Sequence, residues 1–154
     1  MKHIKIFLPI CILLIILTGC KDKTKTTTCT LESDQKPNGY ILNNKYTIYY
    51  SKDIVKKVEI NQVISSEKND ILNSFKESIS KQYESNNNLY GGYTYDVKVD
   101  KDKLEANITI DYTKVNLDKY SKDNEAMKEY LTDGKLTKDK LIELYKTSGI
   151  KCEK

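Results

Sequence analysis

The sequence is poor in the residues that carry much of enzyme and nucleic-acid chemistry. It has one histidine, His3, no tryptophan, and no arginine among its 26 basic residues. The chain after residue 3 has no histidine, so it lacks Ser–His and Cys–His nucleophile pairs and histidine-bearing zinc sites. Its 22 acidic residues nearly balance the lysines, which argues against a nucleic-acid partner. We therefore expect no enzyme activity, no metal ion, no cofactor and no bound nucleic acid.

The first twenty residues predict an export signal. Lys2 and Lys5 precede an apolar run over residues 6–17, and Leu17-Thr18-Gly19-Cys20 resembles the lipobox of bacterial prolipoproteins. As a helix, the segment up to Cys20 would reach about 22 Å, too short for a hydrocarbon core of about 30 Å. We therefore expect a signal peptide at 1–19 and a lipid on Cys20, palmitate included, that holds the protein on the extracytoplasmic face of the cell membrane.

Two further cysteines lie at opposite ends of the mature chain. Cys29 and Cys152 would be exported to a compartment where thiols oxidise, so they are candidates for a disulfide. Two free thiols, or two ligands of a soft metal, remain the alternatives. Two sulfurs without a histidine make a poor metal site.

The pattern after Cys20 predicts a tether and one domain. Residues 20–28 are polar and lack apolar positions, and 29–154 have the size of one domain. Apolar and polar residues alternate in a first hairpin near 46–64 and in a second at 93–112, which is typical of antiparallel strands with one wet face.

The helical segments are expected between and after these hairpins. Residues 67–83 carry apolar side chains at helical spacing, with Ser66 as N-cap and the polar run at 85–88 as the stop. Residues 125–131 predict a second helix that Gly134 closes, and 137–146 a third. The fold class is therefore α+β: a two-layer sandwich of antiparallel β-hairpins with helices packed on one face.

The mature region as a whole resembles a known family. The segments that carry the resemblance include Cys29-Thr30-Leu31-Glu32, Tyr90-Gly91-Gly92-Tyr93 and Gly149-Ile150-Lys151-Cys152. Together they are similar to the YehR-like family of small bacterial lipoproteins, over roughly residues 28–152. The resemblance implies a two-layer α/β sandwich and carries over no catalytic residue.

Few residues stand out as binding candidates. Tyr49 has polar neighbours at strand spacing, and Tyr90 lies beside Gly91 and Gly92, which permit close backbone approach. The Tyr-Gly-Gly segment either stacks on a sugar or peptide or makes a tight turn into a strand, and we favour the turn. The leading hypothesis is a binding module with an unknown partner at the cell envelope. The alternatives are a small-ligand or glycan receptor and a carboxylate-based cell-wall hydrolase.

Overall fold

The computed structural model describes residues 23–153. The expected signal peptide and Cys20 lie outside this range. Within it, no helix has the length and apolar character needed to cross a membrane. The elements in chain order are β1 (Lys25–Gln35), η1 (Lys36–Asn38), β2 (Tyr40–Ser51), β3 (Ile54–Ser65), α1 (Asn69–Tyr90), β4 (Tyr93–Asp100), β5 (Lys103–Asp111), α2 (Leu117–Asp123), η2 (Glu125–Tyr130), β6 (Leu131–Thr132), β7 (Lys135–Leu136), α3 (Lys138–Thr147) and β8 (Lys151–Cys152).

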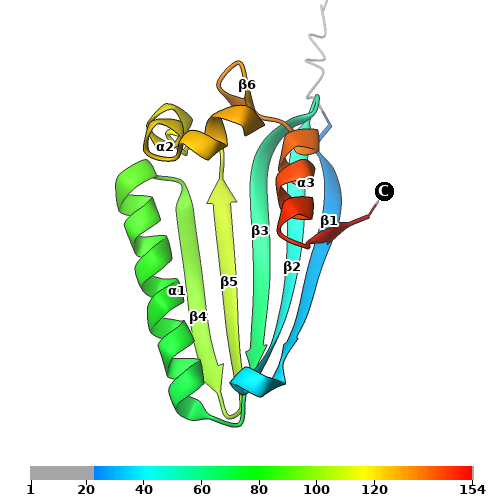
Figure 1. The fold of residues 1–154 in the computed structure, drawn as a ribbon. Helices are drawn as coiled ribbons and strands as arrows, with labels where there is room; N and C mark the ends of the chain where they lie inside the picture. Colours follow the sequence, from blue (N-terminus) through cyan, green and yellow to red (C-terminus); the bar gives the residue numbers. More distant parts are fainter. Residues whose placement is uncertain (1–22, 154) are drawn as a thin grey trace, which may run out of the picture.

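Six strands form one antiparallel sheet in the order β4-β5-β3-β2-β1-β8. The long helix α1 and the shorter α3 lie against one face of this sheet, and α2 and η2 cross its end (Figure 1). The predicted α+β sandwich, with hairpins and helices on one face, is confirmed.

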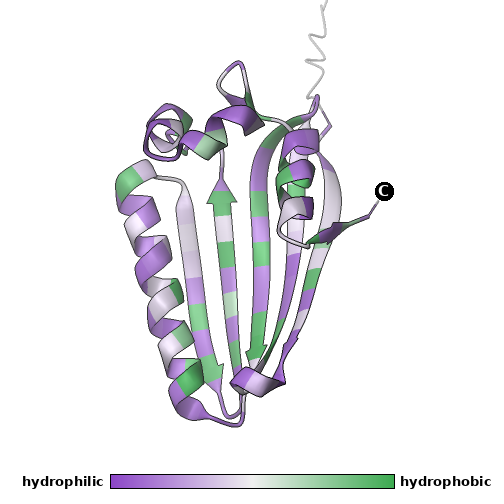
Figure 2. Cartoon of the chain, in the orientation of Figure 1, coloured by the Kyte–Doolittle hydropathy of each residue, from purple (hydrophilic) through white to green (hydrophobic). Residues whose placement is uncertain are grey.

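The core lies between the sheet and the helices. Ile48, Ile64 and Leu104 are fully buried there, and Leu72 reaches them from α1. Hydrophobic and hydrophilic bands alternate along β3 and β5 (Figure 2), because successive strand residues point to opposite faces. The same alternation that builds the core therefore leaves a second, polar face.

The helix α1 is longer than the sequence pattern predicts. The stop expected at 85–88 is wrong, since the helix continues to Tyr90. Asparagine is only a modest helix former, but Tyr90 is buried and packs edge-on against Tyr120 at 4.9 Å between ring centroids. Packing of the last turn therefore outweighs the weak local propensity, and Gly91 ends the helix.

The last third of the chain also differs from the prediction. Residues 125–130 form the 3₁₀ helix η2, and Gly134 lies in the turn between β6 and β7. The helix α2 was missed, although Asn116 caps it by accepting a hydrogen bond from the Lys119 N–H at 2.9 Å. The helix expected at 137–146 is present as α3, with Thr137 as its N-cap.

The start of β1 departs from the expected domain boundary. The strand begins at Lys25, inside the segment expected to be a tether, because Lys25–Thr28 pair with the far end of β2. Near its middle, Cys29 is bonded to Cys152 of β8, which confirms the predicted disulfide.

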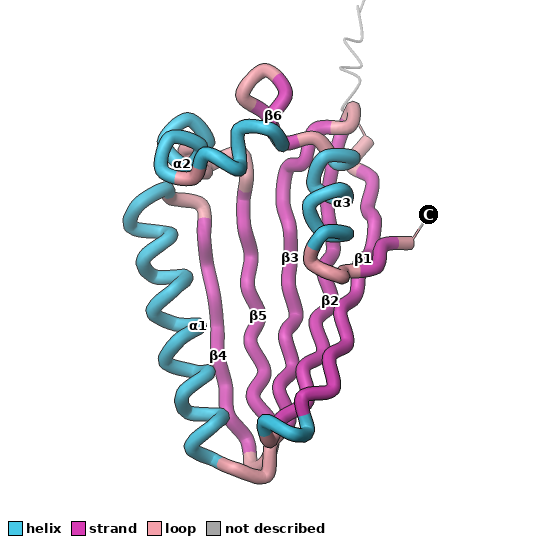
Figure 3. The backbone as a smooth tube through the Cα atoms, viewed as in Figure 1, coloured by secondary structure: helices cyan, strands magenta, loops and turns pink. Residues whose placement is uncertain are grey.

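The connections gather at the two ends of the sheet (Figure 3). The β1–β2, β3–α1 and β4–β5 links share one end, and the described chain begins at the other (Figure 1). The end with these three links is called the distal end below.

Candidate functional site

The face of the sheet opposite the helices carries polar side chains at most of its positions. Every odd-numbered residue from Lys57 to Ser65 on β3 points to it, while the even-numbered ones from Val58 to Ile64 face the helices. No helix of residues 23–153 covers this side (Figure 1). This surface is called the open face below.

On the open face, residues that pair in register on neighbouring strands form rows that run across the sheet. Each row takes one residue from each of the five long strands, so its side chains stand about 4.8 Å apart. The central row is Thr28, Thr47, Glu59, Thr109 and Thr94, and the row next to it is Thr30, Lys45, Asn61, Asn107 and Asp96.

A tyrosine, a lysine and a carboxylate form a cluster on this face. The Tyr49 hydroxyl donates to Glu59 Oε2 at 2.7 Å, and Lys57 Nζ donates to Glu59 Oε1 at 2.6 Å. Lys57 Nζ also lies 4.1 Å from the centroid of the Tyr49 ring. The hydrogen bond from Lys57, then that from Tyr49, lowers the pKa of Glu59, so this carboxyl is held ionised.

Amide side chains continue the network toward β5. Asn61 Nδ2 donates to Glu105 Oε1 at 3.0 Å and to Asn107 Oδ1 at 2.9 Å. These bonds join β3 to β5 and fix the rotamers of the central side chains. The open face is therefore pre-ordered, which lowers the entropy lost when a ligand binds.

Other groups in the centre of the face keep their hydrogen-bonding capacity. Among residues 23–153, no side-chain partner engages the hydroxyls of Thr47 and Thr109, and no ion pair engages Lys45. These side chains, with Glu59, Asn61 and Asn107, line a shallow hollow of about 280 Å³. The centre of the open face thus combines fixed polar groups with unused donors and acceptors.

The candidate residues of the Tyr-Gly-Gly segment lie elsewhere. Tyr90 is buried at the end of α1, and Gly91 and Gly92 have φ of 72° and 80°. A Cβ on Gly92 would lie 2.7 Å from the Asp111 carbonyl oxygen. The two glycines therefore make the tight turn from α1 into β4, and the structure does not bring Tyr90 together with Tyr49.

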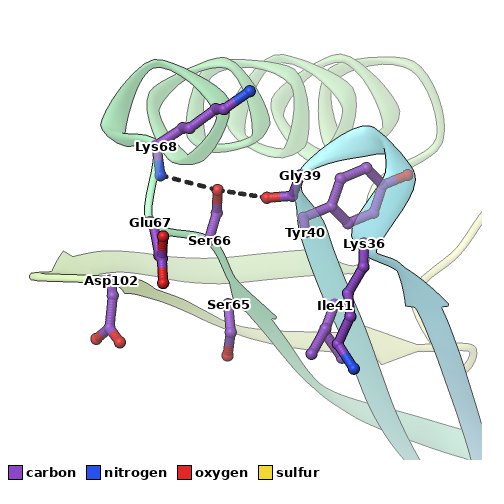
Figure 4. A pocket seen from close by; sticks show the side chains of 9 residues that line it. All are labelled: Lys36, Gly39, Tyr40, Ile41, Ser65, Ser66, Glu67, Lys68 and Asp102. Carbon is purple, nitrogen blue, oxygen red and sulfur yellow. Dashed lines mark hydrogen bonds between the residues drawn. The ribbon is translucent and has the colours of Figure 1, made fainter.

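A second hollow lies at the distal end. It has a volume of about 380 Å³, and Figure 4 shows the nine residues that line it. Ser66 organises it: its hydroxyl donates to the Gly39 carbonyl at 2.7 Å and accepts from the Lys68 N–H at 3.1 Å, and its own N–H donates to the Asp102 carbonyl at 2.9 Å. Ser66 therefore links three segments by hydrogen bonds. It is not the N-cap residue of α1, contrary to the prediction from the sequence. The lining residues are Lys36, Gly39, Tyr40, Ile41, Ser65, Ser66, Glu67, Lys68 and Asp102.

The chemistry of both hollows is that of hydrogen bonding and mixed charge. In the part of the chain that the structure describes, no three His, Cys, Asp or Glu side chains are grouped to hold a metal ion. The carboxylates of the second hairpin spread out: Asp96 pairs with Lys98 at 2.8 Å and Asp111 with Lys114 at 3.0 Å.

Sequence reasoning singled out Tyr49 but missed its partners. Lys57, Glu59 and Asn61 share one parity on β3, and a hairpin prediction places that parity opposite the core. The signal was therefore present, but alternation alone does not give the register that brings Glu59 beside Tyr49 and Thr109.

Comparison with known proteins shows the fold. No protein-family model matches the chain, and no curated protein matches it. The NMR structure of a protein from Streptococcus pneumoniae TIGR4 is similar, with 15% identity, a TM-score of 0.54, and coverage of 99% of this chain and 96% of that one. The NMR structure of the E. coli YehR protein is similar as well, with 18% identity, a TM-score of 0.56, and coverage of 86% and 92%. The chain therefore has a YehR-like fold.

Proposed function

We propose that the protein is a lipid-anchored binding module of the cell envelope that holds its partner on the open face of the sheet. The observation that carries this proposal is that no helix of residues 23–153 covers the open face. This face is left as a broad, pre-ordered polar surface with unused hydrogen-bonding groups at its centre.

The lipobox supports the anchored part of the proposal. Leu17-Thr18-Gly19-Cys20 supplies the modified cysteine, and the sheet begins at Lys25. The four residues between them reach at most about 14 Å when extended. A lipid on Cys20 would therefore keep the sheet close to the membrane surface, with the distal end pointing away.

The electrostatics of the central carboxylate favour binding over acid–base catalysis. Glu59 has a lowered pKa and both of its oxygens are engaged, by Lys57 and Tyr49. A general acid near neutral pH needs a raised pKa. Glu59 is suited to orienting a ligand as a fixed acceptor.

Photo-crosslinking in intact cells tests the proposal with the full chain anchored through Cys20. A photoreactive residue replaces Asn43, an exposed position on the open face, or Glu77, an exposed position on α1. We expect reproducible adducts from position 43 and not from position 77. Equal yields from both positions would show that the open face has no special role.

A second candidate function is a receptor for a small polar ligand at the distal end. Two lysines and two carboxylates line the hollow there together with Tyr40, whose ring packs against that of Phe75 at 5.0 Å between centroids. Such mixed charge fits a zwitterion. Tyr40→Ala should abolish ligand-induced shifts in the NMR signals of residues 65–68 if this hollow is the site. Ligand-induced shifts confined to the open face would rule the receptor out.

A further inference from the structure

We infer that the partner held by the open face is an uncharged, polyhydroxylated polymer, that is, a neutral glycan strand. This inference rests on the proposed function and names its ligand class. It depends on what the open face offers to a partner, and on what it lacks.

The open face lacks the side chains that anchor protein partners. Protein interfaces draw most of their binding energy from a few large side chains, chiefly Trp, Tyr and Arg. Among residues 23–153 the exposed large hydrophobic residue is Leu89, which lies on α1 and away from the open face. Tyr49 is on this face, but its hydroxyl is bonded to Glu59 and Lys57 lies over its ring.

The charges of the open face do not select a charged polymer. Lys57 is paired with Glu59, and Lys98 with Asp96, so these charges are satisfied within the face. Lys45 is the central lysine without an ion pair among the described residues. Anionic lipid surfaces and nucleic acids require clusters of basic residues. Glu32, Asp100 and Glu105 also lie on the open face and have no ion pair among the described residues, so lysines and carboxylates are interspersed rather than gathered in a block of one sign. This interspersed arrangement fits a ligand without net charge.

What the open face offers is a regular array of donors and acceptors. Threonine hydroxyls flank Glu59 on both sides in the central row, and two asparagine amides occupy the next row. Neighbouring strands hold these groups about 4.8 Å apart, comparable to the separation of hydroxyls across a pyranose ring. A sugar hydroxyl both donates and accepts, so it can bond to a carboxylate, an amide and a threonine at once.

The hollow in the centre of the open face is the place where a sugar would contact this array. It is lined by Thr47, Glu59 and Thr109 together with the amides and Lys45, and its floor is the backbone of Ile60 and Ile108. The hollow is shallow and lies on an open surface, which suits a strand of linked sugars that enters and leaves along the sheet. A compact solute needs an enclosing pocket that buries most of its surface.

Co-sedimentation with purified cell-wall sacculi tests the inference. The protein without its signal peptide is mixed with sacculi stripped of anionic wall polymers, and soluble chito-oligosaccharides serve as competitor. The test variant is Thr47→Val with Thr109→Val, which removes two hydroxyls and keeps β-branched side chains suited to strands. The control is Thr132→Val, an exposed threonine of β6 outside the six-stranded sheet.

We expect the wild type and the Thr132→Val variant to sediment with the sacculi and to be displaced by the competitor. The double variant should bind roughly thirtyfold more weakly, since two lost hydrogen bonds at about 1 kcal/mol each remove about 2 kcal/mol of binding free energy. Its unfolding midpoint in urea should stay close to that of the wild type, which separates loss of binding from loss of folding.

Four outcomes would overturn the inference. Undiminished sedimentation of the double variant would show that the hydroxyl array does not bind the glycan. Binding only to walls that retain their anionic polymers would show that the ligand is charged. No sedimentation, combined with protein adducts from position 43 in cells, would reject the glycan while leaving the binding module intact. Absence of both sedimentation and adducts would remove the proposed function as well.

Discussion

Cys29 and Cys152 face each other directly across the β1–β8 pair, although 123 positions separate them in the chain. Cys29 is 1% exposed, and β8 has only two residues. A two-residue strand contributes few backbone hydrogen bonds of its own. The disulfide therefore fastens the end of the chain, and α3 before it, to the edge of the sheet.

Removing this disulfide should lower the stability of the domain substantially. Closing a loop of this length restricts the unfolded chain, and the expected loss is about 4–5 kcal/mol in the free energy of unfolding. Urea denaturation of the Cys29→Ala, Cys152→Ala double variant measures it. Wild-type protein in reductant is the control and should match the variant. A double variant as stable as the oxidised wild type would contradict the prediction.

Gly92 should tolerate a side chain far less well than Gly149. Both residues have a positive φ, 80° and 77°. A Cβ on Gly92 would meet the Asp111 carbonyl and the Val115 side chain within 3 Å, whereas nothing lies within 4 Å of a Cβ on Gly149. We expect Gly149→Ala to cost about 1 kcal/mol and Gly92→Ala about 2–4 kcal/mol, measured by urea denaturation. Equal losses would show that φ alone sets the cost.

The residue pattern predicts the two long hairpins because their alternation is almost unbroken, and alternation reports burial directly. The ends of helices are harder to predict from the residue pattern. The limit of α1 depends on the contact of Tyr90 with Tyr120, which lies 30 positions further along the chain. The short helix α2 carries no long apolar period, and its cap residue Asn116 is one of many asparagines.

In the candidate site, too, the features set by local sequence could be predicted and those set by long-range contacts could not. Tyr49 was singled out because its strand neighbours are polar, which is local information. The cluster with Lys57 and Glu59 requires the register between β2 and β3, which shifts at Tyr49/Tyr50 through an irregularity in the pairing. Parity predicts which side chains share a face, but long-range pairing decides which of them touch.

Tyrosines packed in or against the core should make the domain sensitive to alkali. Burial raises the pKa of Tyr112, of Tyr93 and of Tyr145 above the usual value near 10. Below pH 10 both the folded and the unfolded chain hold these protons. Above it the unfolded chain loses them first, so stability falls as the pH rises through the folded pKa values.

An ultraviolet titration of tyrosine ionisation, followed together with circular dichroism, measures this effect. We expect a fraction of the twelve tyrosines to ionise only as the fold is lost. Complete ionisation near pH 10 with an intact circular dichroism spectrum would contradict the prediction.

Glu59 should contribute a small acid-dependent stabilisation. Its pKa is lowered by Lys57 and Tyr49, so its contribution is present above the unfolded pKa, near 4.3, and is lost as the pH falls through the lower folded pKa. At neutral pH, Glu59→Gln should cost less than about 1 kcal/mol, because the pair is partly solvated.

The measurement is the difference in urea midpoint between wild type and Glu59→Gln, from about pH 6 to about pH 3. The difference should shrink as the pH falls. Glu84→Gln makes the same charge change on α1 and is the control. A difference that stays constant over this range would show that the stability effect does not come from the carboxylate charge.

Replacing Cys20 with Ala should remove the protein from the membrane. The thiol is the atom that takes the lipid, and processing of the signal peptide depends on that modification, so the variant should be released or remain as an unprocessed precursor. Cell fractionation with labelled-lipid incorporation measures both results. Cys29→Ala is the control, since it changes a cysteine outside the lipobox and should leave the label in place. Unchanged membrane retention and lipid labelling of the Cys20→Ala variant would show that Cys20 is not the lipid-modified residue. The membrane would still raise the local concentration of the open face, but a part of the chain other than Cys20 would have to provide the attachment.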